Sequence, residues 1–427
     1  GGGGGAFGPR RGPFGPEEAV IRALPGCRTV GGGRAEAMAG ARDTFLDVFR
    51  SFGYRLFFPS GLQSLEDVWP RVTPAFRRRL VTLLSPGGEP CCLRGDLTLA
   101  AVAHLVAHHE PHERPLRLCY ADRVYRIPGD SGEPLERFQV GAELLGWEGH
   151  GADAELLALL MRSLARMGAT GCTAVLGDVT LVEEALEALP APIGAALGEA
   201  LRRQDLTTYQ GIMARAELPA ERRPLLEELP WLKGDRTVLD RAVRLGVAPS
   251  RVAPLHFLAE TLESLECGAD LRFDLALFRE LGYYSGPVFE IYAPCGGRPL
   301  GGGGRYDGLL ASHGLLGQAL GVALDLEALA EATLEKKEGR PGVMVWGGSG
   351  TSAHTMKVAE LLVGRGWTVE LSWIEDATAS RSLARIKKFR WWVDGAAESV
   401  TFLRNSHTVP LERWLAKPED QGEDGSC

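Results

Sequence analysis

The sequence lacks three features that mark specialised classes of protein. None of its eight cysteines forms a Cys-x-x-Cys pair, which argues against a zinc site. No run of about 18 apolar residues is present, so no membrane-spanning helix is expected. Positive charge is also in deficit, because 47 Lys and Arg stand against 55 Asp and Glu. We therefore predict a cytoplasmic, reducing environment with buried thiols, no metal or cofactor, and no main role in neutralising a nucleic-acid backbone.

Both ends of the chain and one internal stretch are predicted to lie outside the packed domains. The opening "GGGGGAFGPRRGPFG" has no apolar core of a signal peptide, so residues 1–24 are predicted to form a flexible leader. The charged stretch "EKKEGRPG", residues 335–342, is typical of a linker. The acidic residues 417–427 are predicted to be a disordered tail.

Hydrophobic periodicity between these segments predicts an α+β fold. Helical spacing covers 34–51, 96–109 and 152–167, and residues 171–251 read as a mainly helical insertion after one short strand near 174–177. Strand character is expected at 53–63, which Pro59 closes, and again from 271, 287 and 318. The alternating segments 116–127 and 137–146 are predicted to pair as an antiparallel hairpin.

Residues 342–416 have the alternating strand and helix pattern of a separate small α/β domain. Its "VMVWGGSGTS" lacks the spacing of a dinucleotide-binding loop, so an ordinary strand-to-helix turn is favoured. The segment "ARIKKFRWW", residues 384–392, mixes basic and aromatic residues and could contact RNA. A helix that runs into a strand with buried tryptophans is the favoured interpretation.

Three segments carry candidate ligand-binding residues. "RFQVGAELLG" places Gln139, Gly141 and Glu143 on one face of a strand, where they could hold a small polar ligand or form an exposed sheet face. "GYYSGPVFEIY" and "GGGGRYDGLL" add tyrosines, and the glycines of 301–304 are interpreted as a loop that lets the backbone approach a ligand. His104 lies one helical turn from His108, but a solvated helix face is favoured over a metal site.

The motifs "LRGDLT", "RFQVGAELLG", "YYSGPVFEIY" and "GGGGRYDGLL" resemble those that bind histidine in histidyl-tRNA synthetases and in their paralogues, the regulatory subunits of ATP phosphoribosyltransferase. The resemblance covers residues 25 to about 333. It implies a class II aminoacyl-tRNA synthetase-like antiparallel sheet flanked by helices, formed by 25–170 and 252–334. Residues 342–416 would resemble an anticodon-binding domain, and a homodimer would form around "FGYRLFFPSGLQ".

The resemblance also implies a histidine pocket. The acid at position 96 would hold the α-ammonium group of the ligand, the arginine at 279 would lie near its carboxylate, and tyrosine hydroxyls would bond the imidazole. Residues that match the family's pocket are Asp96, Thr98, Arg126, Gln139, Glu143, Arg279, Tyr283, Tyr284 and Tyr306.

Three departures from the synthetase pattern distinguish between the two relatives. Pro128, Leu135 and Ala328 stand where a synthetase has a glutamate that contacts adenine and two arginines. Loss of one such donor typically costs about a hundredfold in rate, so adenylation is not expected. We predict a non-catalytic subunit that binds histidine for feedback control of the first step of histidine biosynthesis. Its partner would be the short-form catalytic subunit of ATP phosphoribosyltransferase.

Two rival functions stay open at this stage. An active histidyl-tRNA synthetase is supported by Arg279 and the C-terminal domain, but opposed by the three departures. A synthetase-like sensor or RNA-binding protein without a transferase partner is opposed by the acidic charge and the missing basic patch. Membrane and nucleic-acid partners are not expected.

Overall fold

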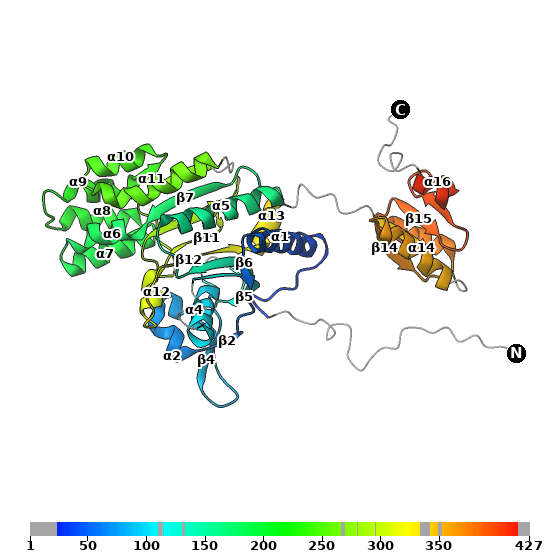
Figure 1. Cartoon of the computed structure of the whole chain (residues 1–427), viewed down its shortest axis with the longest axis horizontal. Helices are drawn as coiled ribbons and strands as arrows, with labels where there is room; N and C mark the ends of the chain where they lie inside the picture. Colours follow the sequence, from blue (N-terminus) through cyan, green and yellow to red (C-terminus); the bar gives the residue numbers. More distant parts are fainter. Residues whose placement is uncertain are drawn as a thin grey trace. The chain divides into compact units, whose positions relative to one another are not determined.

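The computed structural model describes residues 24–109, 113, 115–129, 133–265, 270–279, 281–294, 296–333, 342–348 and 352–416 (Figure 1). The predicted leader up to residue 23, the linker from 335 to 341 and the acidic tail lie outside these ranges, as do Cys267, Cys295 and Cys427. Contacts divide the chain into two compact units, Gly1–Glu335 and Lys336–Cys427.

A nine-stranded sheet forms the centre of the first unit, in the order β1-β5-β6-β12-β11-β10-β7-β9-β8. Neighbouring strands are antiparallel except for the β1–β5 and β7–β9 pairs, which are parallel. In sheet order the strands are β1 (Arg55–Leu56), β5 (Leu116–Tyr125), β6 (Glu136–Leu145), β12 (Ala319–Asp325), β11 (Pro299–Arg305), β10 (Pro287–Tyr292), β7 (Thr173–Asp178), β9 (Asp270–Asp274) and β8 (Lys233–Gly234).

The predicted antiparallel hairpin of β5 and β6 is confirmed, and its register separates two faces. Tyr120 lies opposite Gly141 and Leu118 opposite Glu143 on one face. The intervening residues of the other face, such as Val140 and Leu144, are fully buried in the main core. This alternation is what a strand period of two requires when both faces are covered.

Helices cover the Val140 face of the sheet. α1 (Gly32–Ser51) packs against α5 (His150–Met167) and α13 (Leu326–Thr333), and α11 (Pro249–Ser264) packs on α5. The stacked rings of Phe45 and Phe49, 4.3 Å apart between centroids, lie fully buried in this layer. Burial of a side chain of this size stabilises the fold by about 1.5–3 kcal/mol.

The opposite face carries the second core cluster, which surrounds the candidate site. Its helices are α2 (Leu65–Val68), α3 (Pro74–Arg77), α4 (Leu97–His108) and α12 (Asp307–Ala311), beside a small sheet in the order β2 (Leu62–Ser64), β4 (Pro90–Leu93) and β3 (Thr82–Leu84). α4 begins where the Asp96 carboxylate accepts the backbone N–H of Leu99 at 2.8 Å, as an N-cap residue does.

The prediction of strand character through residues 53–63 is wrong for most of that segment. Only Arg55–Leu56 and Leu62–Ser64 are strands, and they belong to different sheets. Pro59 lies between them and has no N–H to donate, so a continuous ladder cannot pass through it.

The segment from 171 to 251 begins with a strand of the large sheet, β7, which lies between β10 and β9. Helices follow it: α6 (Val179–Glu187), α7 (Ala191–Arg202), α8 (Leu206–Arg215), α9 (Arg223–Glu228) and α10 (Thr237–Arg244) (Figure 1). Throughout the described residues, no helix is both long and apolar enough to cross a membrane.

The second unit is a five-stranded sheet in the order β14-β13-β15-β16-β17. Its elements are β13 (Gly342–Trp346), α14 (Ser352–Gly364), β14 (Thr368–Ser372), α15 (Ala377–Ile386), β15 (Trp391–Asp394), β16 (Ser399–Phe402), β17 (Thr408–Pro410) and α16 (Leu411–Ala416). Trp391 and Trp392 are buried, so the favoured interpretation of "ARIKKFRWW" is confirmed: a helix precedes a strand with buried tryptophans.

The described cysteines agree with the predicted buried thiols. Cys27, Cys91, Cys92, Cys119 and Cys172 are free, and all but the half-buried Cys27 are buried. Burial raises the pKa of the Cys92 and Cys119 thiols to about 11, so both remain protonated near neutral pH.

Candidate functional site

Glu143 on β6 is the centre of a buried cluster of hydroxyl groups. Its side chain is fully buried, and its Oε1 accepts hydrogen bonds from Thr98 Oγ1 at 2.8 Å and from the Tyr120 hydroxyl at 2.9 Å. The Tyr306 hydroxyl donates to Oε2. Three donors from α4, β5 and the start of α12 therefore hold one carboxyl group in a fixed position.

Burial raises the pKa of Glu143 to about 8. The hydroxyl donors of Tyr306 and Thr98 act in the opposite direction, and the nearby Asp96 carboxylate reinforces the rise. Near neutral pH the group is therefore mostly protonated, and a polar ligand that enters the cluster meets an acid able to donate as well as to accept.

Asp96 is a second buried acid beside the cluster. Its Oδ1 caps α4, and its Oδ2 accepts from the Tyr283 hydroxyl at 3.2 Å. Burial raises the pKa of Asp96, which the Leu99 N–H and the positive charge of Arg126 oppose. Arg126 donates to the carbonyl of Gly95 at 2.8 Å, and its guanidinium lies 5.1 Å from the Phe76 ring centroid. Oδ1 of Asp96 therefore serves to cap α4, and Oδ2 faces the tyrosines.

An aromatic wall joins the two acids. The rings of Tyr283 and Tyr306 meet edge to face at 5.7 Å, and Tyr284 lies 5.0 Å from Tyr283 between ring centroids. The Arg279 guanidinium is 5.9 Å from the ring of Tyr284. This wall brings together side chains from the segment between β9 and β10 and from the start of α12.

Arg279 is paired with Glu290 on β10. Its Nη1 lies 3.0 Å from Glu290 Oε1, and the Tyr292 hydroxyl donates to the other oxygen of Glu290 at 2.7 Å. The positive charge at this end of the site is therefore partly neutralised and held in place.

The glycine run is a strand, so its interpretation as a loop is wrong. Residues 299–305 form β11, between β10 and β12. A Cβ at Gly303 would lie 1.9 Å from the carbonyl oxygen of Gly321 on β12, so the close approach is between neighbouring strands. At Gly301 and Gly304 φ is 154°, which residues with a Cβ rarely adopt.

Glycines also make room for side chains of the site. A Cβ at Gly302 would meet Arg279 Nη1 at 2.5 Å, and one at Gly321 would meet Glu143 Oε2 at 1.7 Å. A Cβ at Gly141 would collide with the Tyr120 ring at 2.5 Å. At each of these three glycines, the missing Cβ leaves room for a side chain of the site.

Tyr120 belongs to the cluster but was not predicted from the sequence. Gln139 was predicted but lies at the edge of the cluster. Tyr120 lies in the alternating strand of the predicted hairpin, opposite Gly141, so the register was the signal that could have revealed it. Gln139 shares the face of Glu143 and lies between Asp122 and Asp325 in the ladder. It is half-buried, and no hydrogen bond among the described residues links it to Glu143.

Pro128, Leu135 and Ala328, the three departures from the synthetase pattern, have uncharged side chains. The carbonyl of Leu135 accepts the N–H of Arg126 at 2.9 Å, and its own N–H donates to Gly26 at 2.8 Å. A Cβ at Gly26 would touch both Leu135 and Pro128, so the start of the described chain lies over these two positions. Ala328 lies in the first turn of α13 and packs on the core.

Of the two histidines in α4, His108 is exposed and His104 is half-buried. His104 stacks on Phe57 at 5.6 Å between centroids and lies 3.4 Å from His109 between their Nε2 atoms. Desolvation and the neighbouring histidines lower the pKa of His104. In the described part of the chain, no group of three or more His, Cys, Asp or Glu side chains is arranged to hold a metal ion.

Comparisons with known proteins agree on one family. The family model described as histidyl-tRNA synthetase matches residues 26–329. The chain is 39% identical over 304 residues to a protein of Anaeromyxobacter sp. (strain K) named ATP phosphoribosyltransferase regulatory subunit, covering 69% of this chain and 86% of the relative. A protein of Moorella thermoacetica with the same name is 33% identical over 84% of this chain and 94% of its own length.

A solved structure is similar in fold. A protein of Bacillus halodurans, described as an ATP phosphoribosyltransferase regulatory subunit/histidyl-tRNA synthetase, superposes with a TM-score of 0.76 at 26% identity. The match covers 85% of this chain and 96% of that one. The class II synthetase-like α+β fold that the sequence predicts is thereby confirmed.

Proposed function

Because the chain belongs to the family of ATP phosphoribosyltransferase regulatory subunits, with their histidyl-tRNA synthetase-like fold, we propose that it regulates a catalytic transferase subunit. It binds histidine at the Glu143 cluster and transmits feedback inhibition to the short-form catalytic subunit, which carries out the first step of histidine biosynthesis. The assembly works in the cytoplasm.

The observation that carries this proposal is the buried Glu143 with its three hydroxyl donors. An imidazole has one N–H donor and one acceptor nitrogen when neutral, and two donors when charged. A carboxyl group whose pKa lies near 8 is suited to either state, because it can accept from one nitrogen or donate to the other. Asp96 and Arg279 then provide opposite charges for the α-ammonium and α-carboxylate of the same small ligand.

Regulation follows if histidine has different affinities for two states of the assembly. A ligand that binds both states equally shifts nothing, whatever its affinity. The histidine-bound chain therefore has to favour the arrangement in which the catalytic subunit is inhibited.

The proposal assigns no chemistry to this chain. Transfer at an α-phosphate requires positive charge where charge develops in the transition state. Pro128, Leu135 and Ala328 offer none at the positions where a synthetase has it.

We further place a homodimer contact at the face around Phe57 and Phe58. Phe58 is 81% exposed, beside a groove of about 370 Å³ between the 57–64 segment and α4. Aromatic side chains are enriched at protein–protein interfaces, which favours this face for the contact.

A mixing experiment tests the regulatory role. The full chain is added to a short-form catalytic transferase subunit, and the rate of phosphoribosyl transfer is measured with and without histidine. We expect activation on mixing and reversal by histidine, with direct histidine binding by calorimetry. Absence of any association at micromolar concentrations would refute the role.

An active histidyl-tRNA synthetase is the second candidate, because Arg279 is retained and the similar Bacillus halodurans structure carries both names. Histidine-dependent exchange of pyrophosphate into ATP distinguishes the two functions. Exchange at rates of a working synthetase would establish this candidate and exclude the non-catalytic role.

A further inference from the structure

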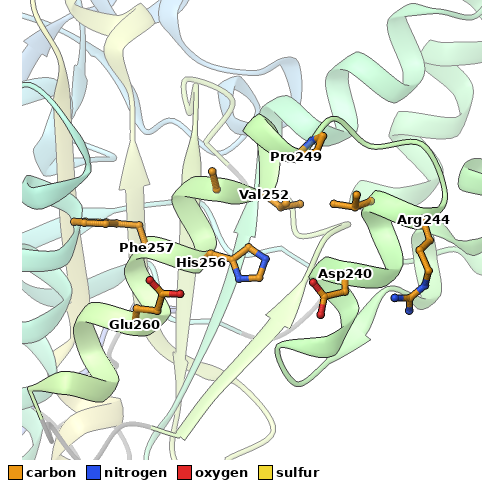
Figure 2. Close-up of a pocket in the computed structure, with 9 residues that line it drawn as sticks. Asp240, Arg244, Pro249, Val252, His256, Phe257 and Glu260 are labelled. Atoms are coloured by element: carbon orange, nitrogen blue, oxygen red, sulfur yellow. The ribbon is translucent and has the colours of Figure 1, made fainter.

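A groove outside the Glu143 cluster lies between α10 and α11. It encloses about 630 Å³ and has an apolar floor that includes Val243, Val252 and Ala253. Charged side chains form its rim, with Asp240 and Arg244 on α10 and Glu260 on α11 (Figure 2). Phe257 lies at one end of the groove and is 42% exposed.

The polar side chains of α11 in this groove are paired with Arg236, which precedes α10. Arg236 donates to His256 Nδ1 at 3.0 Å and forms an ion pair with Glu260. Because Nδ1 of a neutral His256 accepts this bond, its ring proton lies on Nε2, and the ring extends toward Asp240 (Figure 2). This side of the groove therefore has a fixed arrangement before anything binds.

The α10 side is not paired. Asp240 and Arg244 are spaced i,i+4 and exposed, and neither side chain has a hydrogen bond or ion pair among the described residues. They present opposite charges about one helical turn, roughly 6 Å, apart along the helix axis. A partner helix with a cation and an anion at the same spacing, on either side of an apolar side chain, complements this rim and floor.

A chain of contacts connects this groove to the Glu143 cluster. The ring of Phe257 lies 6.4 Å from that of His150 at the start of α5, between centroids. His150 Nδ1 is 3.4 Å from Asp153, which forms a buried ion pair with Arg305 at the end of β11. The next residue, Tyr306, donates to Glu143. These contacts join α11 to side chains that hold the cluster.

We propose that the groove between α10 and α11 is the docking surface for the catalytic transferase subunit, occupied by an amphipathic helix of that subunit. The helix places an apolar side chain on Val243, Val252 and Ala253, a cation opposite Asp240 and an anion opposite Arg244. The inference rests on the proposed regulatory function and names the surface through which it acts.

Two substitutions test the surface without touching the Glu143 cluster. Ala253→Trp fills the groove from an exposed helical position, and Asp240→Lys reverses an exposed charge that has no hydrogen-bond or ion-pair partner among the described residues. Glu221→Lys is the matched control, because this exposed acid of the same helical segment lies outside the groove. Each full-length variant is titrated with labelled catalytic subunit by fluorescence anisotropy, and with histidine by calorimetry. Thermal melts establish that each variant is folded.

We expect wild type and Glu221→Lys to associate equally, and the two groove variants to lose at least about tenfold in affinity, with histidine binding unchanged by Glu221→Lys and Asp240→Lys. If both folded groove variants associate like wild type, the docking surface is refuted while the regulatory function stands. If wild type itself does not associate, the regulatory function fails and the docking surface fails with it.

Discussion

At the scale of single residues, the hydroxyl of Tyr306 is one of the three donors that hold Glu143. Tyr306→Phe removes the donor to Oε2 and leaves a buried acceptor without that partner. We expect histidine affinity, measured by calorimetry, to fall about 10- to 100-fold, equivalent to about 1.4–2.8 kcal/mol. Tyr209→Phe is the control, because its hydroxyl donates to the Leu226 carbonyl at 2.8 Å within the helical segment. Equal losses in both variants would argue against a role for Tyr306 in the pocket.

Glu143 also makes stability depend on pH. Its pKa is about 8 in the folded protein and near 4.3 when unfolded, so between these values the folded protein holds a proton that the unfolded chain has released. The contribution is present in full below the unfolded pKa and is lost as pH rises through 8. From this proton the free energy of unfolding falls by up to about 1.4 kcal/mol per pH unit.

Denaturant unfolding between pH 5.5 and 9 measures this effect. In Glu143→Gln the falling component is absent, so the difference from wild type changes with pH. The exposed Glu148→Gln serves as the control and is expected to follow wild type. Parallel curves for wild type and Glu143→Gln would contradict the assignment.

At the scale of elements, the sequence predicted the β5–β6 hairpin but not β11. Alternation over ten residues in each strand was enough to place Glu143 and Gly141 on one face. Four consecutive glycines have low strand propensity and show no alternation, so β11 could not be recognised from its own residues. Its strand conformation depends on β10 and β12, which approach too closely for any Cβ. Tyr120 was missed for a related reason, because its role depends on register rather than on a motif.

The close approach at β11 predicts a sharp contrast between two glycines. Gly303→Ala would place a Cβ 1.9 Å from the Gly321 carbonyl oxygen, which is backbone and cannot turn away. We expect this variant to lose more than about 3 kcal/mol of unfolding free energy or to be insoluble. A Cβ at Gly308 in α12 meets nothing within 4 Å, so Gly308→Ala should unfold within about 1 kcal/mol of wild type. Similar melting curves for both variants would show that β11 tolerates side chains.

At the scale of the whole molecule, the two units have separate cores. The clusters around Phe45 and around Tyr306 consist only of residues before 333, whereas those around Trp391 and Trp392 consist only of residues after 342. Each unit therefore has the core that an independent domain requires.

A chain that ends at Glu335 should consequently keep the histidine affinity of the full chain within about twofold. Calorimetric titration of both chains with histidine measures this, and circular dichroism establishes that the shortened chain is folded. A larger loss of affinity in a folded shortened chain would assign part of the binding site to the second unit.

The glycines of β11 are weak evidence of function, because the sheet itself requires them. Gly301, Gly303 and Gly304 are required by backbone geometry, whether or not a ligand ever enters the pocket. A chain with the same sheet but a different ligand would still need these glycines. Glu143, Pro128 and Leu135 are the better residues by which to classify relatives. A relative with neither histidine binding nor catalysis would still need the glycines of β11.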